Sequence, residues 1–226
     1  MLKRIFYLIL LLVLQHNLLA QDWAELGRYR DDNARLKKSA KSENIVVFLG
    51  NSITDSWPSN MPEFFEKNNF VGRGISGQTT PQMLVRFRPD VIDLNPAAVV
   101  ILAGTNDIAE NTGPATIEEI FGNICSMAEL AAANNIKVIL CAVLPAFDYP
   151  WRSGLKPAEK IVRLNSLLKD YATKNGHAFL DYHSPMADEK NGMLEQYTYD
   201  GVHPNDAGYL LMASMVEKVL SKILKE

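Results

Sequence analysis

The sequence predicts an α/β fold in which helices cover both faces of a parallel sheet. Five short runs rich in Val, Ile, Leu and Phe alternate with segments whose apolar residues recur at helical spacing. Continuous apolar runs are typical of strands that are buried on both faces of a parallel sheet. Their alternation with helices indicates parallel βαβ units joined by right-handed crossovers. Because the sequence contains no internal repeat or linker, residues 21–226 are expected to form one domain.

The five predicted strands are short, and several end in a turn signal. They are expected at residues 45–49, 70–75, 98–103, 137–143 and 178–182. The first of them ends at Gly50, a residue that permits a tight turn. The carboxyl ends of parallel strands meet at one edge of a sheet, where ligands bind. Segments that follow the strands are therefore expected to share one crevice.

Five helices are predicted between and around these strands, at residues 23–36, 81–94, 114–134, 157–174 and 206–224. The pattern is clearest in 114–134, where Ile117, Ile120 and Ile124 fall on one face. Within 81–94, Pro89 is a candidate break.

Residues 1–20 have the layout of a secretory signal peptide. Lys3 and Arg4 precede an apolar run over residues 5–14, and the segment ends at Ala20. The run is about ten residues long, whereas a membrane-spanning helix needs about 20, which favours a cleaved signal over an anchor. No cysteine lies near the cut, which disfavours a lipid-anchored lipoprotein. We therefore expect cleavage near Ala20, export to the periplasm or the exterior, and no membrane anchor on the mature chain.

The charge balance excludes one class of partner. The chain carries a net charge of −3, and loss of Lys3 and Arg4 with the signal changes this to −5. A mildly acidic chain without a cluster of Lys and Arg has no electrostatic footprint for nucleic acid. The oligomeric state is left open by the sequence.

Neither a cofactor nor a metal is expected. The two cysteines, Cys125 and Cys141, fall in interior helix and strand patterns, where cysteine is usually a small apolar residue. A bridge between them is the alternative that export would permit. His183 lies near Asp181 and Asp188, but these residues lack the spacing of a metal site.

Ser52 is a candidate nucleophile. It follows the first predicted strand by two residues, at the expected start of a helix or turn. Backbone N–H groups at a helix N-terminus are unpaired and can stabilise an oxyanion. Asn51 and Ser52 taken alone are also typical helix caps, so the position has a purely structural alternative.

Asp200 and His203 supply what a serine nucleophile lacks. A neutral imidazole can accept the serine proton, and a carboxylate on the other ring nitrogen holds the imidazole in the required tautomer. Asp200 lies three residues before His203 with Gly201 at the bend, so its carboxylate can reach back to the ring. The alternative is that residues 200–205 only form the start of the last helix, and both can hold.

Two turns offer hydrogen-bond donors to an oxyanion. Asn106, in the turn 104–107 after a buried strand, would direct its amide into the crevice. Such an amide stabilises the transition state by about 3–4 kcal/mol in comparable enzymes. Gly77 could add a backbone N–H. Asparagine and glycine are also ordinary turn residues.

An aromatic loop, residues 144–152, follows the fourth strand at the same edge. Tyr149 and Trp151 could stack on sugar rings, and Arg152 could hydrogen-bond hydroxyl groups. The alternative is that this loop packs on the body of the protein.

The four blocks together resemble the SGNH family of hydrolases, also called the GDSL esterases and lipases. The blocks are residues 50–54, 74–77, 104–107 and 200–203, and they occur in the family order. The resemblance implies a three-layer α/β/α sandwich with a five-stranded parallel sheet, of the flavodoxin-like type. It also implies a catalytic triad of Ser52, His203 and Asp200, with an oxyanion hole formed by Ser52, Gly77 and Asn106.

One position departs from the family pattern. The first block usually reads Gly-Asp-Ser, whereas this chain has Asn51 before Ser52. The competing α/β-hydrolases share the order serine, acid, histidine, but their Gly-x-Ser-x-Gly elbow is absent here.

The expected activity is ester hydrolysis through an acyl-Ser52 intermediate. The substrate is expected to be a small-molecule or glycan ester, and many secreted members of the family remove O-acetyl groups from glycans. Carbohydrate O-acetyl esters are therefore the leading expectation. Lysophospholipid, aryl ester and thioester substrates, or a glycan-binding module without catalysis, remain alternatives.

Overall fold

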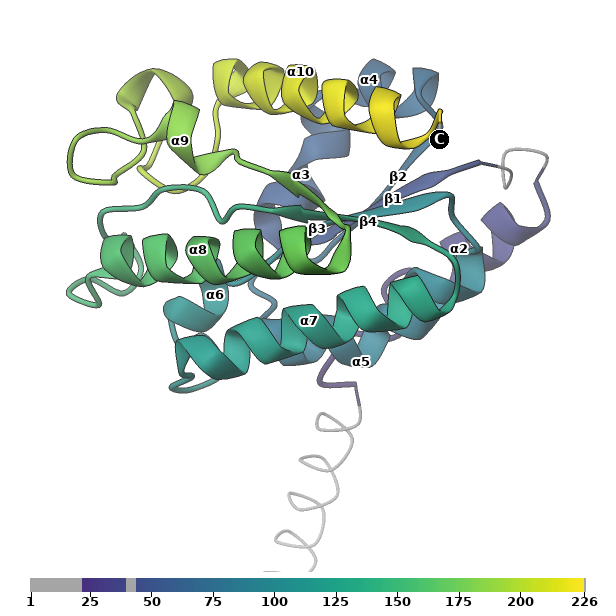
Figure 1. The fold of residues 1–226 in the computed structure, drawn as a ribbon, viewed down its shortest axis with the longest axis horizontal. Helices are drawn as coiled ribbons and strands as arrows, with labels where there is room; N and C mark the ends of the chain where they lie inside the picture. Colours follow the sequence, from purple (N-terminus) through teal and green to yellow (C-terminus); the bar gives the residue numbers. More distant parts are fainter. Residues whose placement is uncertain (1–21, 40–43, 226) are drawn as a thin grey trace, which may run out of the picture.

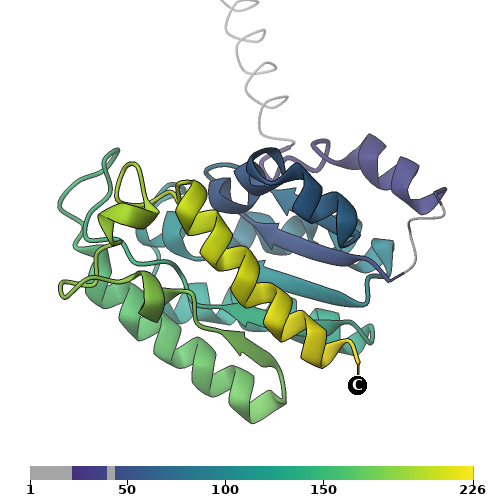
Figure 2. The same cartoon turned by 90° about the horizontal axis from the view of Figure 1, so that it is seen from above.

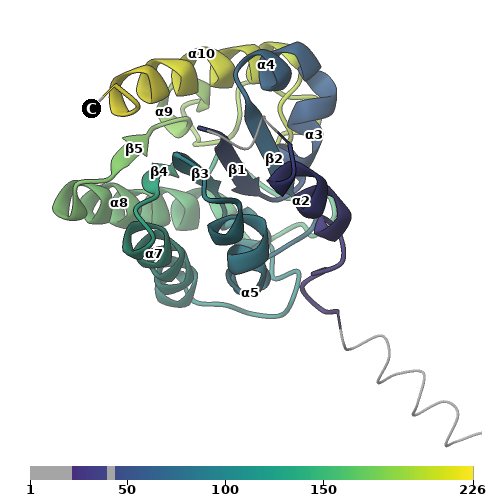
Figure 3. The same ribbon diagram turned by 90° about the vertical axis from the view of Figure 1, so that its right-hand side faces the viewer.

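The computed structural model describes residues 22–39 and 44–225, and it has three layers (Figure 1). One layer of helices lies above the sheet and another below it, and the view along the strands separates them clearly (Figure 3). The predicted signal peptide lies outside the described residues. No helix among the described residues has the length and hydropathy needed to cross a membrane.

The central sheet contains five parallel strands in the order β2-β1-β3-β4-β5. In chain order these are β1 (Val46–Gly50), β2 (Phe70–Gly74), β3 (Ala98–Leu102), β4 (Lys137–Cys141) and β5 (Ala178–Leu180). Every residue of β1 and β3 is buried, as expected for strands covered on both faces. The predicted strands and the parallel α/β class are confirmed.

Two hydrophobic cores fill the space between the layers. On one face α5 (Thr80–Asp90), α7 (Ile117–Ala133) and α8 (Pro157–Asn175) pack on the sheet. On the other face lie α3 (Ser52–Asn60), α4 (Pro62–Lys67) and α10 (Asp206–Ile223). Figure 2 shows α10, in yellow, crossing that face. Four shorter helices lie in the connections: η2 (Ile92–Leu94), α6 (Thr105–Ile108), α9 (His183–Met186) and η3 (Glu195–Tyr197).

One helix prediction needs correction, and the predicted break in another is confirmed. The predicted helix 23–36 is shorter, because residues 22–29 form turns and α2 begins at Arg30 (Arg30–Lys37). The Asp22 carboxylate accepts hydrogen bonds from the N–H groups of Leu26 and Gly27, and these bonds hold the chain in a turn. The candidate break at Pro89 is confirmed, because α5 ends one residue later, at Asp90, and the rest of the predicted segment forms the separate 3-10 helix η2. Pro89 has no N–H to donate to the preceding turn, which weakens the end of the helix.

The cysteines are both unpaired and buried, as the interior interpretation predicts. Burial raises the pKa of the Cys125 thiol to about 11 and also raises that of Cys141.

The strand register brings the sequence blocks to one edge. Gly50, the last residue of β1, pairs with Gly74 of β2 and with Leu102 of β3. The segments that begin just after these residues therefore leave the sheet at the same level. This is the edge where ligands bind in open α/β sheets.

Candidate active site

Ser52, His203 and Asp200 form a continuous chain of hydrogen bonds. The Ser52 Oγ lies 2.9 Å from His203 Nε2, and His203 Nδ1 lies 2.6 Å from Asp200 Oδ2. Residues 151 positions apart are thus in direct contact. The arrangement has the geometry of a nucleophile, a base and a carboxylate that orients the base.

Ser52 is presented by the first turn of α3. The side-chain oxygen of Asn51 accepts a hydrogen bond from the Ile53 N–H at 3.1 Å, so Asn51 is the N-cap of the helix. The turn lies directly against β2, because a Cβ on Gly74 would lie 2.1 Å from the Asp55 nitrogen. Only glycine allows this approach, which sets Ser52 at the end of the sheet.

Asp200 and His203 are held by their own loop. The Oδ1 atom of Asp200 accepts hydrogen bonds from the N–H groups of Val202, at 2.9 Å, and His203, at 2.7 Å. Desolvation raises the pKa of Asp200, but the hydrogen bonds from His203 and Val202 outweigh it and hold that pKa below its ordinary value. Asn205 caps α10 through the Gly208 N–H. Both sequence interpretations of residues 200–205 are therefore satisfied at once.

The structure places Asn106 and Gly77 in adjoining turns. The buried Asn106 amide donates one hydrogen bond to the Gln78 carbonyl at 3.0 Å. Gly77 has a φ of +79°, a left-handed conformation that disfavours other residues. Its carbonyl accepts from the Asn111 amide at 3.2 Å. These bonds fix the two turns relative to each other.

A buried carboxylate anchors the turn that carries Asn106. Asp107 accepts hydrogen bonds from the Thr80 N–H at 2.9 and 3.0 Å and from the Thr80 hydroxyl at 2.6 Å. Burial raises the pKa of Asp107 to about 6, although the bonds from Thr80 act in the opposite direction. Asp107 thereby ties α6 to the N-terminus of α5, where a negative charge is stabilised.

Arg86 links two of the sequence blocks and was missed by sequence reasoning. Its fully buried guanidinium donates to the Gly50 carbonyl at 3.0 Å and to Gln78 Oε1 at 2.6 Å. It also pairs with Asp90 at 3.0 Å. Since Gly50 precedes the Ser52 turn and Gln78 holds Asn106, one side chain connects both. An arginine in an amphipathic helix pattern gives no signal of such burial.

Two aromatic rings flank His203. The Trp151 ring lies 6.0 Å from the imidazole between centroids, and Tyr199 stacks on it at 6.2 Å with an interplanar angle of 9°. Trp151 is 45% exposed and Tyr199 is 70% exposed. Tyr199 was not among the predicted site residues; its position next to Asp200 was the only available signal.

The predicted stacking role of Tyr149 is wrong. Its side chain is fully buried, its hydroxyl lies 2.9 Å from Thr105 Oγ1, and its ring stacks under Trp151 at 5.1 Å. The guanidinium of Arg152 is paired with Glu110 at 3.1 Å and donates to the Glu110 carbonyl at 2.6 Å. Both residues therefore fasten the aromatic loop to the body, whereas the exposed Trp151 ring lies beside His203.

Two of the three residues considered for a metal, Asp181 and Asp188, have structural partners instead. Asp181 accepts from the N–H and hydroxyl of Ser184, and Asp188 accepts from the Gly192 N–H. In ranges 22–39 and 44–225, no three His, Cys, Asp or Glu side chains are grouped so that they could hold a metal ion.

Solved structures with the same fold include two from Bacteroides. A Bacteroides fragilis protein assigned as an acylhydrolase is 51% identical, with a TM-score of 0.87, over 90% of this chain and 99% of its own. A GDSL-like lipase from Bacteroides thetaiotaomicron is 50% identical, with a TM-score of 0.86, over 89% of this chain and 99% of its own.

A more distant relative matches only in part. The uncharacterized lipoprotein YqeF of Bacillus subtilis is 31% identical over 83 residues, which are 35% of this chain and 34% of that protein. The match thus spans about a third of the length of that relative.

A sequence model of the GDSL-like lipase/acylhydrolase family matches residues 48–211, which include all four blocks and nearly the whole sheet. The blocks, the strand order and the near-complete overlap with the two Bacteroides structures agree with this match. The chain belongs to the GDSL-like lipase/acylhydrolase family of ester hydrolases.

Proposed function

We propose that the protein is an exported serine esterase that hydrolyses short acyl esters, O-acetyl esters of carbohydrate in the first place. The observation that carries the proposal is the hydrogen-bonded chain from Ser52 through His203 to Asp200. In this proposal Ser52 is the nucleophile, His203 is the general base and acid, and Asp200 orients the imidazole.

Acyl transfer would take two steps. The Ser52 Oγ attacks the ester carbonyl carbon while His203 Nε2 takes the hydroxyl proton. The tetrahedral intermediate then releases the alcohol, which receives that proton from His203, and leaves an acyl-Ser52 ester. Water attacks this ester with His203 again as base, which releases the carboxylic acid and regenerates free Ser52.

The negative oxygen of the intermediate would be held by three donors. The Ser52 N–H belongs to the first turn of α3, where N–H groups lack helical partners. The Gly77 N–H and the second N–H of the Asn106 amide complete the set, because the first N–H of that amide is used by Gln78. Each donor of this kind stabilises the transition state by about 3–4 kcal/mol.

Two features of the surface beside His203 support a substrate that carries a short acyl group on a polar alcohol. Trp151 and Tyr199 offer exposed aromatic faces beside His203, of the kind on which sugar rings can stack. A groove that includes Tyr199 and Pro204, the neighbours of His203, is lined mainly by polar side chains, which suit a polar alcohol better than a long acyl chain.

Export and a single mature domain over residues 21–226 are part of the same proposal. The layout of residues 1–20 supports a signal peptide that is cleaved near Ala20. The name lipoprotein, which the Bacillus subtilis relative carries, supports export. Mass spectrometry of the secreted protein would test the cleavage site.

The decisive test is the replacement Ser52→Ala. We expect it to reduce kcat for p-nitrophenyl acetate by at least about 10⁴-fold, and the combination with His203→Ala should add little, because triad members act as a unit. The matched control is Ser126→Ala, since the exposed Ser126 hydroxyl bonds to the Gly122 carbonyl within α7.

Acyl chain length then separates the alternatives. Wild-type protein should prefer acetate over octanoate esters and should release acetate from acetylated oligosaccharides. A preference for long acyl chains would instead indicate a lipid or thioester substrate. Normal turnover by Ser52→Ala would overturn the nucleophile assignment, and a wild-type protein inactive on every ester would indicate a binding module.

A further inference from the structure

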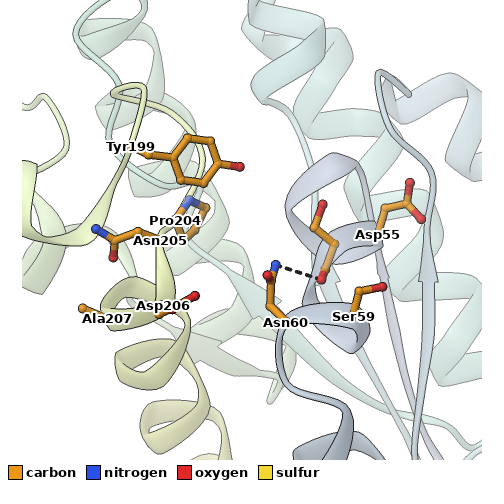
Figure 4. A pocket seen from close by; sticks show the side chains of 9 residues that line it. Asp55, Ser59, Asn60, Tyr199, Pro204, Asn205, Asp206 and Ala207 are labelled. Atoms are coloured by element: carbon orange, nitrogen blue, oxygen red, sulfur yellow. Dashed lines mark hydrogen bonds between the residues drawn. The ribbon is translucent and has the colours of Figure 1, made fainter.

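A polar groove lies beside the candidate active site, between α3 and the first turn of α10 (Figure 4). It encloses about 790 Å³, within the range of roughly 300–1,000 Å³ that is typical of small-molecule sites. We call it the α3–α10 groove; Ser59 and Asn60 line it from α3, and Tyr199, Pro204 and Asp206 line it from the opposite side.

The groove lies next to His203 through two of its lining residues. Tyr199 lines it and also stacks on the His203 ring, and Pro204 follows His203 directly. An alcohol that leaves a tetrahedral intermediate on Ser52 takes its proton from His203. The part of the substrate beyond that oxygen would therefore extend past the Tyr199 ring into the groove.

The side chains that line the groove suit hydroxyl groups. Figure 4 shows the Tyr199 hydroxyl and the Asp206 carboxylate directed across the gap toward α3, with the Asn60 amide facing them. The Asp206 carboxylate forms no hydrogen bond or ion pair with any residue in the described part of the chain, so its oxygens remain open to a ligand. Asp55, by contrast, points away and pairs with Arg28 at 3.5 Å and with Ser76 Oγ at 2.8 Å.

The negative charge of the groove argues against anionic ligands. Asp55 and Asp206 line it, and no lysine or arginine does so among the residues that the structure describes. Asp55 is paired with Arg28, so the open charge of the groove is that of Asp206, and this carboxylate disfavours a phosphate headgroup or a uronic acid because like charges repel. Polar lining also disfavours an acyl chain, whose burial stabilises a complex only against apolar surface.

We propose that the α3–α10 groove binds the neutral, hydroxyl-rich alcohol portion of the ester, a saccharide unit next to the acylated one. Tyr199 would provide the stacking surface, and Asp206 and Asn60 would bind hydroxyl groups. This inference rests on the proposed esterase function, because it places the leaving alcohol relative to Ser52 and His203.

The test separates binding from catalysis. Binding of acetylated xylo-, manno- and cello-tetraose to the Ser52→Ala protein is measured by titration calorimetry, alone and with a second substitution. Tyr199→Ala should raise Kd about tenfold through loss of stacking. Asp206→Ala should raise Kd about fivefold through loss of a hydrogen bond, and Asp206→Asn should restore most of the affinity.

Glu159→Ala is the matched control. Like Asp206, Glu159 is the acidic residue in the first turn of a long helix, and it lies outside the groove. The Ser52→Ala protein that also carries Glu159→Ala should have the same Kd as Ser52→Ala alone. Thermal unfolding of each variant shows whether the helix terminus is intact.

Turnover is then measured with proteins that retain Ser52. For Tyr199→Ala and Asp206→Ala, the ratio of kcat/KM on the preferred tetraose to that on p-nitrophenyl acetate should fall by the same factors as the affinity. Lack of binding to all three neutral tetraoses, tighter binding of acetylated oligogalacturonate, or an unchanged ratio in both variants would each overturn the groove proposal. Failure of the esterase function shows itself differently, as unchanged ester hydrolysis by Ser52→Ala.

Discussion

Asn51 occupies the position before Ser52 where the family usually has aspartate. Its side-chain oxygen caps α3 through the Ile53 N–H, while the residue itself is buried. An amide oxygen caps a helix about as well as a carboxylate does. The hydrogen bond that presents Ser52 is therefore retained without the charge.

Replacement of Asn51 tests this capping role. Asn51→Ala should lower the free energy of unfolding by about 1 kcal/mol, within the range of roughly 0.5–2 kcal/mol for lost caps. It should also reduce kcat, because Ser52 is the first residue of the uncapped helix. Urea denaturation and p-nitrophenyl acetate kinetics measure the two effects.

The matched variant is Asn51→Asp, which keeps the acceptor and adds a charge at a helix N-terminus, where it is favourable. It should retain wild-type stability or exceed it. A loss of stability equal to that of Asn51→Ala would contradict the capping role.

At the scale of elements, α5 and α6 are joined by a carboxylate with an unusual environment. Asp107 is buried and accepts three hydrogen bonds from Thr80, yet burial raises its pKa to about 6. The ordinary value is 3.8. The folded protein thus holds this proton more tightly than the unfolded chain, which has a direct consequence for stability.

The raised pKa of Asp107 determines how this residue changes stability with pH. Below pH 3.8 Asp107 is protonated in both states, and the group contributes no penalty. Between that pH and about 6 the unfolded chain releases the proton and the folded chain retains it, so stability falls as pH rises. Above pH 6 both states are ionised and the penalty is complete, on the order of 2–3 kcal/mol.

Asp107→Asn should remove this dependence. The difference in unfolding free energy, wild type minus variant, should decrease between pH 4 and about 6 and then level off, as measured by urea denaturation at each pH. The other carboxylates, including Asp200, are common to both proteins and cancel in the difference. A difference that stays constant from pH 4 to 7 would contradict the raised pKa.

At the scale of the whole molecule, the N-terminal segment closes a buried polar network behind the site. The Asn33 amide donates to Asp90 at 2.7 Å, and its oxygen accepts from Arg73 at 2.9 Å. The Ala24 carbonyl accepts from Gln78 at 2.8 Å, the same residue whose own carbonyl holds Asn106. A segment outside the four sequence blocks thus supports the oxyanion donors.

Removal of residues 22–38 should therefore weaken the protein and its activity together. Each buried group left without a partner lowers the free energy of unfolding by about 1–3 kcal/mol. Because Arg73, Asp90 and Gln78 all lose partners, the total decrease should exceed about 3 kcal/mol. Calorimetry and kcat measure the outcome against the chain that begins at Gln21. Unchanged stability and kcat would show that the segment is dispensable.

Much of this molecule can be predicted from local patterns. Strand and helix periodicity reflects burial on one or two faces, so runs such as 45–49 and 98–103 reveal a parallel sheet before any contact is known. Ser52, Asn106 and His203 could be selected because each follows a strand or precedes a helix, and the strand order then implies a common edge.

Contacts between distant residues were decided only by the tertiary structure. Tyr149 and Trp151 have the same local pattern, yet one is buried against Thr105 and the other is exposed beside His203. Arg86 carries no sequence signal of its burial, and the position of Tyr199 next to Asp200 does not show that its ring stacks on His203, because burial and stacking depend on which surfaces meet after folding. The sequence by itself determined the sheet, its reactive edge and the order of the chemical groups along it. The tertiary structure decided which side chains hold those groups in place and which remain free to meet a substrate, because these properties arise from packing between segments far apart in the chain.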